Sequence, residues 1–391
     1  MYDIILFENF HSAYRHRFDV RLIAQLLKSK GMDVAILNVY GEEKVEEVSP
    51  IPLIEYNAKY PIPDDNSWIN SKKNPVLRLF YAIRFLWQQH LYYKDVVGFV
   101  SDKAKSLYCG SYHLLMPAAF FKLNMPCFYW GLRSSRMTGF YYHFKKNPFL
   151  ALRMLYLKHL FFRNKQQCLF VSNDIIKGEF VNLGIDEDRL IIRDERCIDD
   201  CVEENEKRKK DPFFSLLIIG GLRKQKRVPL SIRAFKLAAI EGSKLKIVGE
   251  NKDTDYEECL QEEIGGDESI LRLNSRLDYE DFNKYLSQAH FTLFADEKGP
   301  SSVTNGTMME SLINYTPIIA PDYPPYSYYV NQYKLGLLYN PDSIGSYSEV
   351  IREAKRLGAS SFADNISTFL ETIRFNAVAN KLYEKVKKAL P

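Results

Sequence analysis

The chain of 391 residues is longer than one hydrophobic core usually supports, so its length predicts two domains. Its content of 46% apolar and 26% charged residues excludes a disordered chain. The net charge of +4 is too small to indicate a nucleic-acid partner, and no nucleic-acid-binding motif is present.

The six cysteines argue against a metal site. They form no C-x-x-C pair, and Cys197 and Cys201 have no neighbouring His or Cys to complete a ligand set. We expect buried, reduced thiols and no metal cofactor. The sequence shows no signal-peptide pattern after Met1 and no apolar run of about 18 residues that could span a bilayer. This favours a cytoplasmic protein.

Alternating apolar and amphipathic segments predict a Rossmann-like first half. Residues 2–7 and 34–39 are predicted to be buried strands around an amphipathic helix, 19–30, which ends at Gly31. Residues 45–73 are expected to be irregular. Further strands are predicted at 106–110, 127–130, 168–172 and 190–193, and further helices at 75–93, at 113–123, from Pro148 onward, and up to Gly184.

A basic segment lies within this half. Between Asp102 and Asp174 the chain has eleven Lys or Arg residues and no acidic residue. Residues 140–165 combine these charges with aromatic and aliphatic residues in an amphipathic pattern. Such a helix could lie against an anionic membrane and make the protein peripheral on the inner face of the cell membrane. It could equally be a core helix with a solvated basic face.

The second half repeats the alternation after a charged linker, residues 202–212. Residues 214–250 are predicted to form a strand, a Gly-Gly turn, a basic loop, a helix and a strand. Strands at 270–274 and 290–294 follow, separated by a helix that Asp278 caps. The final segment of the chain is predicted to be helical.

Residues 294–322 carry the strongest functional signal. An apolar strand leads through a turn-rich loop into a helix from Asn305 to Asn314, and a second apolar strand follows. In such a βαβ unit the helix N-terminus lies at the carboxyl edge of a parallel sheet, where backbone amides and the helix dipole favour a phosphate. Glu310 lies one turn into this helix. The pattern predicts an anion site with a carboxylate beside it.

These segments resemble the family-4-like glycosyltransferases of the GT-B fold, the glycosyl transferases group 1. Glu310 and Pro317 match the second half of that family's Glu-x7-Glu motif, with Ser302 in place of the first Glu. Residues 214–250 match its strand ending in Gly, its basic cluster with Lys226, its helix with an Ala-Phe pair, and the sequence KIVGE. The resemblance covers most of residues 165–341.

The resemblance implies an α/β protein of two Rossmann-like domains that face a central cleft. Residues 1–201 are then the acceptor-binding domain and residues 213–366 the nucleotide-sugar-binding domain. Residues 367–391 form a helix that crosses back onto the first domain.

The resemblance also implies the reaction. A sugar moves from a nucleotide-sugar donor to a glycan or lipid-linked acceptor, in polysaccharide or glycoconjugate biosynthesis, with retention of configuration and without a metal. Lys226 matches the family's diphosphate-binding Lys, whereas Gly221 stands where the family has Arg, so Arg223 is the candidate replacement. Cations at this point would stabilise the charge of the leaving diphosphate. Glu310 is expected to bind the donor ribose and completes the catalytic set.

The resemblance further assigns residues to the two substrates. The expected donor-binding residues are Gly220, Gly221, Glu250, Arg276, Leu277, Ser302, Thr304, Asn305, Gly306 and Thr307. The acceptor-binding candidates are His11, Arg15, His113, Arg133 and Arg136. For the latter group a solvated basic loop, an interior His and plain surface charge remain the alternatives.

Other functions remain open. Ser302 and Gly221, which replace two family residues, also fit a catalytically inactive GT-B-like protein that binds a nucleotide or a glycan. A sugar-nucleotide epimerase or a phosphorylase on the same fold is the other enzymatic alternative.

Overall fold

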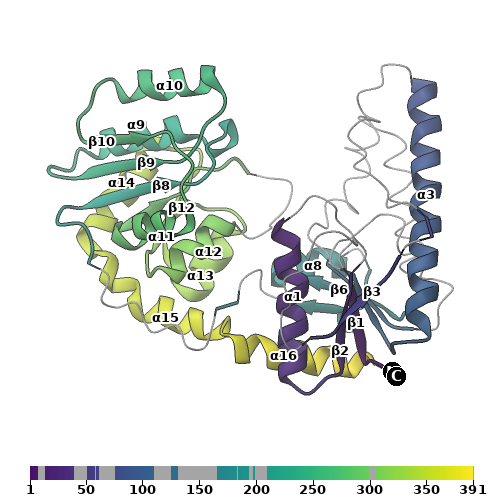
Figure 1. The fold of residues 1–391 in the computed structure, drawn as a ribbon. Coiled ribbons are helices and arrows are strands. Elements are labelled where there is room, and N and C mark those ends of the chain that lie inside the picture. Colours follow the sequence, from purple (N-terminus) through teal and green to yellow (C-terminus); the bar gives the residue numbers. More distant parts are fainter. Residues whose placement is uncertain are drawn as a thin grey trace. The chain divides into compact units, whose positions relative to one another are not determined.

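The computed structural model describes residues 1–7, 14–38, 51–57, 59–60, 75–109, 125–130, 165–182, 184–192, 197–198, 209–298 and 305–390. The chain forms two compact units, and each is considered by itself (Figure 1). The first unit consists of Met1–Asp194 and Asn376–Pro391, and the second of Glu195–Phe375.

The first unit contains a parallel sheet of seven strands in the order β3-β2-β1-β4-β5-β6-β7. This is a doubly wound Rossmann-like order, in which the chain reverses direction between β1 and β4. The strands are β1 (Ile4–Phe7), β2 (Val34–Asn38), β3 (Leu53–Glu55), β4 (Leu107–Cys109), β5 (Cys127–Trp130), β6 (Gln167–Val171) and β7 (Leu190–Ile192).

Strand β3 corrects the prediction that residues 45–73 are irregular. It pairs with β2 through Leu53, Ile54 and Glu55, but it is only three residues long and lies at the edge of the sheet. Because no residue of β3 is fully buried, it needs no continuous apolar run, and Pro52 directly before it suggested a loop.

Within the described residues, the helices of the first unit are α1 (Tyr14–Ser29), α3 (Pro75–Ser101), α8 (Asp174–Asn182) and α16 (Phe375–Ala389), with the 3-10 turn η1 (Glu187–Arg189). Helix α3 continues eight residues beyond the predicted end at 93. Tyr92, Val96, Val97 and Val100 keep the helical spacing there and are buried. The helices predicted at 113–123 and from Pro148 to 164, and most of the membrane-contact segment 140–165, lie outside the described residues.

The second unit contains a parallel sheet of six strands in the order β10-β9-β8-β11-β12-β13. Counted along this unit the order is 3-2-1-4-5-6, the Rossmann order. The strands are β8 (Ser215–Ile219), β9 (Lys244–Val248), β10 (Ile270–Leu273), β11 (Phe291–Leu293), β12 (Ile318–Pro321) and β13 (Gly336–Tyr339). The expected pair of Rossmann-like halves is therefore confirmed.

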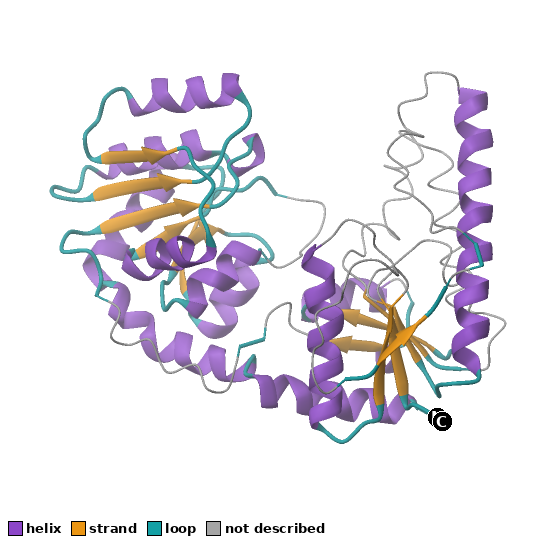
Figure 2. Ribbon diagram, in the orientation of Figure 1, coloured by secondary structure: helices purple, strands orange, loops and turns teal. Residues whose placement is uncertain are grey.

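Helices cover both faces of this sheet (Figure 2). Along β8, Leu216 and Ile218 belong to one hydrophobic cluster, while Leu217 and Ile219 belong to another. Both sides of the strand are therefore buried, which explains its continuous apolar run. The helical segments are η2 (Lys224–Lys226), α9 (Val228–Ala238), α10 (Thr254–Ile264), α11 (Tyr279–Gln288), α12 (Gly306–Ile313), α13 (Tyr326–Tyr333), α14 (Ile344–Leu357), η3 (Ala359–Phe362) and α15 (Ala363–Thr372).

Two predicted helix boundaries can be compared directly with the structure. Asp278 accepts a hydrogen bond from the Asp281 amide at 2.8 Å and caps α11, as predicted. The helical segment predicted at the end of the chain consists of two helices, because α15 ends at Thr372 and α16 begins at Phe375.

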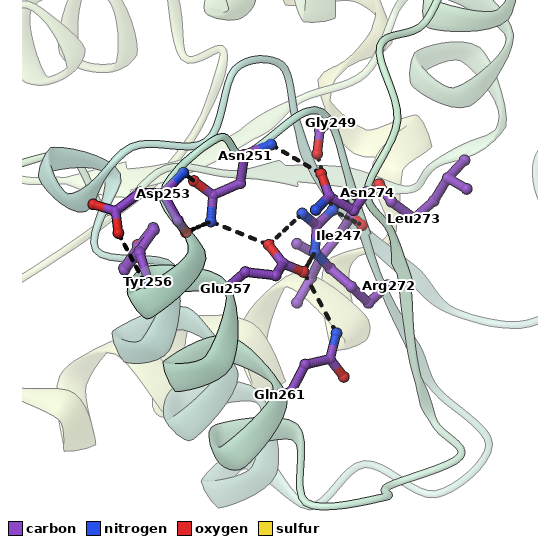
Figure 3. A network of polar contacts seen from close by, with 10 residues as sticks. All are labelled: Ile247, Gly249, Asn251, Asp253, Tyr256, Glu257, Gln261, Arg272, Leu273 and Asn274. Atoms are coloured by element: carbon purple, nitrogen blue, oxygen red, sulfur yellow. Dashed lines mark hydrogen bonds and ion pairs between the residues drawn. The ribbon is translucent and has the colours of Figure 1, made fainter.

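A buried polar network joins β9, β10 and α10 (Figure 3). Arg272 donates to both carboxylate oxygens of Glu257, at 2.9 and 2.8 Å. Its Nη1 also donates to three carbonyl oxygens at the ends of these strands, those of Ile247, Gly249 and Leu273. The guanidinium therefore satisfies five acceptors and fixes the carboxyl ends of β9 and β10 relative to α10.

We expect Arg272→Met to lower the free energy of unfolding by about 3–5 kcal/mol, because it leaves the Glu257 carboxylate and three carbonyls without their donor. Arg233→Met is the matched control, since Arg233 is exposed and lies 3.8 Å from Glu263. Loss of the Arg233 side chain should lower the free energy of unfolding by about 0–1 kcal/mol. Denaturant unfolding measures both, and equal costs would contradict the structural role of Arg272.

The same pair predicts a dependence on pH. Burial raises the pKa of Glu257, but the hydrogen bonds from Arg272 and Asn251 outweigh it and hold that pKa below its ordinary value. A lowered carboxyl pKa contributes stability above the pKa of the unfolded state, and this contribution is lost as the pH falls through the folded pKa. The stability difference between wild type and Arg272→Met should therefore shrink in acid.

Candidate functional site

The candidate site lies at the carboxyl ends of β8 and β11, the two central strands of the second unit. In this sheet β8 lies between β9, the next strand along the chain, and β11. The strand order therefore reverses between β8 and β11. In doubly wound sheets such a reversal opens a crevice in which ligands bind. The turn after β8 runs through Gly220 into η2, and α12 begins after the loop that follows β11.

Three residues predicted from distant parts of the sequence meet at this point. A Cβ atom placed on Gly220 would lie 3.4 Å from the Thr307 hydroxyl oxygen and 3.6 Å from the Lys226 Nζ. Lys226 Nζ also donates to the carbonyl oxygen of Ile219 at 3.3 Å. Gly220, Lys226 and Thr307 therefore form one group, which we call the Gly220 cluster.

The turn at Gly220 depends on a second glycine that the sequence analysis did not single out as a site residue. Gly249 has a φ of +145°, and a Cβ there would lie 2.0 Å from the carbonyl oxygen of Gly220. No side chain fits in that space. Glu250 follows with an exposed side chain, and its carbonyl oxygen accepts from the Leu222 amide at 3.0 Å. Glu250 thus supports the turn through its backbone.

The N-terminus of α12 lies beside the Gly220 cluster and is capped by Asn305. The side-chain oxygen of Asn305 accepts from the amides of Thr307 and Met308, at 2.9 and 3.4 Å. Its amide nitrogen donates to the Tyr326 hydroxyl at 2.8 Å, and that hydroxyl donates to Asp296 at 2.7 Å. This chain of hydrogen bonds fixes the start of α12 relative to the loop after β11.

The surroundings of Lys226 shift the pKa of its side chain. Burial lowers the pKa of its ammonium, the Asp296 carboxylate opposes that shift, and the positive charge of Arg223 adds to it. Arg223 therefore lies within electrostatic range of Lys226, while its own side chain is exposed. A partly buried cation beside a helix N-terminus favours a bound anion.

Asp296 and Tyr326 are site residues that sequence reasoning missed. Asp296 comes three residues after the end of β11, a position where polar side chains of a doubly wound sheet often face a ligand. This position after a predicted strand was the feature of the sequence that could have identified Asp296. Burial and the Asp296 charge raise the pKa of Tyr326, so its hydroxyl keeps its proton and donates.

Glu310 lies one turn into α12 and is only 7% exposed. Its backbone carbonyl accepts from Asn314, at 3.1 Å from the amide and 2.9 Å from the side chain. Carboxylates are rarely this buried without a structural or functional partner. Glu310 is therefore an interior residue of the helix and not part of its exposed surface.

The structure describes some of the remaining predicted site residues, and the others lie outside the described part. Gly221 is exposed beside Gly220, and Gly306 is the first residue of α12. Arg276 is exposed, and Leu277 packs against the buried cluster that contains Leu217 and Ile219 of β8; both residues follow the end of β10. The predicted residues outside the described part are Ser302, Thr304, His11, His113, Arg133 and Arg136, together with the side chain of Arg15 in α1.

The described residues contain no group of three or more His, Cys, Asp or Glu side chains placed to hold a metal ion. None of the helices traced there combines the length and the apolar character needed to cross a bilayer.

The lowered pKa of Lys226 makes a prediction for the ligand-free protein. At neutral pH the folded state bears the cost of burying a charged ammonium, and this cost disappears as the pH rises through the lowered pKa. Lys226→Met should therefore raise the melting temperature, by about 2–4 °C for each kcal/mol relieved. The difference in melting temperature between Lys226→Met and wild type should become smaller toward high pH.

Lys244→Met provides the control. Lys244 is exposed at the amino end of β9, the opposite edge of the same sheet. We expect its melting temperature to follow wild type at every pH. A Lys226→Met variant that melts below wild type would show that Lys226 stabilises the ligand-free fold instead.

Comparison with known proteins agrees with this geometry. The family described as Glycosyl transferases group 1 matches residues 200–366. A search of curated proteins finds no match. Among solved structures, the apo form of the lipopolysaccharide outer core galactosyltransferase WaaB is similar with a TM-score of 0.65 and 14% identity, over 99% of both chains.

Two further structures show the same likeness. HepE of Anabaena, solved in complex with UDP, has a TM-score of 0.67 and 13% identity over 99% of this chain and 100% of its own. A glycosyltransferase from Rickettsia africae has a TM-score of 0.66 and 15% identity over 99% of this chain and 98% of its own. At these identities the likeness establishes the fold, and the family match lies on the unit that contains the Gly220 cluster. The chain therefore has the GT-B fold, and residues 200–366 of its second half match the family of group 1 glycosyl transferases.

Proposed function

We propose that the chain transfers a sugar from a nucleoside diphosphate sugar to a glycan or lipid-linked acceptor, in polysaccharide or glycoconjugate biosynthesis. The observation that carries the proposal is the Gly220 cluster, which joins a desolvated lysine to a helix N-terminus at the reversal of the strand order. HepE, a protein of the same fold, was solved with UDP and with UDP-glucose, which supports this class of donor.

In this proposal the donor diphosphate lies against the Gly220 cluster. Lys226 neutralises the charge that develops on the leaving diphosphate, and the exposed Arg223 adds a second cation from the same turn. The Thr307 hydroxyl and the dipole of α12 supply further stabilisation. Asp296 opposes the lowering of the Lys226 pKa and so favours the charged form of the lysine.

Glu310 is proposed to bind the ribose hydroxyls of the donor. Its carboxylate is nearly excluded from water one turn beyond Thr307, so a hydrogen bond to a hydroxyl there is made at low dielectric. Gly220, Gly221, Glu250, Arg276, Leu277, Ser302, Thr304, Asn305 and Gly306 complete the proposed donor site.

The acceptor is proposed to bind the first unit, with His11, Arg15, His113, Arg133 and Arg136 as candidates. Transfer is proposed to retain the configuration of the sugar, with the donor phosphate assisting deprotonation of the acceptor. The cations of the η2 turn would then fulfil the charge-neutralising role that a metal has in other transferases.

Thermal stabilisation by UDP, GDP, dTDP, CMP and their common sugar conjugates tests this donor site. One nucleotide should raise the melting temperature of wild type, by about 2–4 °C per kcal/mol of linked binding energy. Lys226→Met should abolish the shift because the diphosphate loses its cation, and Glu310→Gln should reduce it because the ribose loses a charged acceptor. Lys244→Met and the exposed Glu349→Gln are the controls that should keep it.

The same variants separate the proposal from an inactive protein. Ser302 and Gly221, where the family has Glu and Arg, favour a member that binds a nucleotide without turnover. Slow release of free sugar from the stabilising donor, absent in Lys226→Met, would exclude the inactive alternative. Stabilisation with no hydrolysis and no transfer would support it, and no stabilisation by any nucleotide would contradict both.

Metal removal gives a separate prediction. If the cations of the η2 turn carry the charge of the diphosphate, EDTA should leave the rate of donor turnover unchanged within about twofold. A loss of activity that Mg²⁺ or Mn²⁺ restores would overturn this part of the proposal.

A further inference from the structure

Helix α3 of the first unit has two halves of different character. Its C-terminal part packs into the unit, where Tyr92, Val96, Val97 and Val100 are at most 2% exposed. Its N-terminal part extends beyond the strands of the unit (Figure 1). That part carries four large apolar side chains that are about half exposed or more: Leu77 at 48%, Phe80 at 60%, Ile83 at 56% and Trp87 at 62%.

These four side chains lie on one side of the helix. At 100° per residue, positions 77, 80, 83 and 87 fall within an arc of about 120°. The exposed Arg84 falls within the same arc. Leu91 and Lys94, which come later in the same helix, also fall within this arc. We call this surface, from Leu77 to Lys94, the α3 stripe.

The α3 stripe leads into a cavity of about 490 Å³. Leu91 and Lys94 belong to both. The cavity is lined by Tyr56, Lys59 and Tyr60 from the segment after β3, and by Leu91, Lys94, Asp95, Gly98 and Phe99 from α3. An apolar surface therefore ends in a recess with two lysines.

The acidic group of this recess is already engaged. Asp95 accepts from the Tyr56 hydroxyl, and its Oδ2 accepts from the Lys59 backbone amide at 2.9 Å. Lys59 and Lys94 have exposed side chains. Their ammonium groups give the recess a positive charge toward solvent.

The part of the sequence that contains the α3 stripe is also basic. Residues 66–173 contain sixteen Lys or Arg and only two acidic residues, Asp95 and Asp102, although the whole chain has a net charge of +4. Half-exposed aromatic and aliphatic side chains within a strongly basic region match the chemistry of an anionic lipid surface. A contact with a second copy would instead bring two basic surfaces together, and their like charges repel.

We propose that the α3 stripe binds the surface of an anionic lipid membrane. The helix lies along the membrane with Leu77, Phe80, Ile83 and Trp87 in the boundary of the acyl chains, and Lys59 and Lys94 contact lipid phosphates. A tryptophan is well suited to this depth because its ring is apolar and its N–H is polar. The surface belongs to the first unit, and its test does not depend on donor binding by the second.

Flotation of the full chain with vesicles tests the proposal. The vesicles consist of phosphatidylcholine alone or of phosphatidylcholine with phosphatidylglycerol. Wild type should float with the anionic vesicles at low salt and dissociate as salt rises. Phe80→Gln/Trp87→Gln should lower the partition coefficient by about tenfold or more. Lys59→Gln/Lys94→Gln should lower it by about 25-fold at low salt, at about fivefold per charge.

Matched variants separate the stripe from general surface effects. Leu237→Gln/Leu271→Gln removes two apolar side chains of similar exposure from the second unit. Lys385→Gln/Lys388→Gln removes two exposed charges from α16 of the first unit, the unit that carries the stripe. Both controls should bind anionic vesicles within about twofold of wild type.

Three results would overturn the proposal. The first is wild-type protein that does not float with anionic vesicles at low salt. The second is binding by both stripe variants equal to that of the controls. The third is a dimer of wild type in sedimentation velocity that Phe80→Gln/Trp87→Gln converts to a monomer without any effect on lipid binding, because the stripe would then join two copies.

Discussion

The structure of the second unit depends on how closely two backbone segments approach at the end of β8. Gly249 leaves no room for a side chain against the carbonyl of Gly220, and Lys226 and Thr307 approach Gly220 at 3.6 and 3.4 Å from the position of a Cβ. Arg272 holds the other side of this contact, because it donates to the Gly249 carbonyl while it pairs with the partly buried Glu257. The ion pair of Figure 3 therefore supports the geometry of the site as well as the stability of the sheet.

The site itself is an unfavourable part of the fold. Burial of Lys226 disfavours its charged form, which costs free energy in the absence of a ligand. The apolar residues on both faces of β8 and its neighbours offset this cost. The Asn305 cap and the hydrogen bond from Tyr326 to Asp296 then hold the charged groups in place. Such preorganisation favours a bound anion over water, because the protein dipoles do not have to reorient when the ligand arrives.

The sequence predicted what depends on local pattern. The buried strands and the position of Lys226 follow from apolar runs and from the motif around 214–250. Strand β3 was missed because a short, half-buried edge strand carries no apolar run. Gly249, Asp296 and Tyr326 were missed for another reason. Their roles arise from contacts with residues 29, 30 and 21 positions away in sequence, which periodicity cannot reveal.

The structure also explains how the family's arginine can be absent at Gly221. A Cβ placed on Gly221 would meet no atom within 4 Å, and its φ is not in the left-handed region, so an arginine side chain would fit there. The fold therefore does not require glycine at this position. Two residues further along, Arg223 is close enough to lower the pKa of Lys226, so the turn already concentrates positive charge. A third cation at position 221 would lower that pKa further and weaken the protonation on which the proposed phosphate binding depends. Arg223 thus makes Gly221 compatible with a diphosphate site.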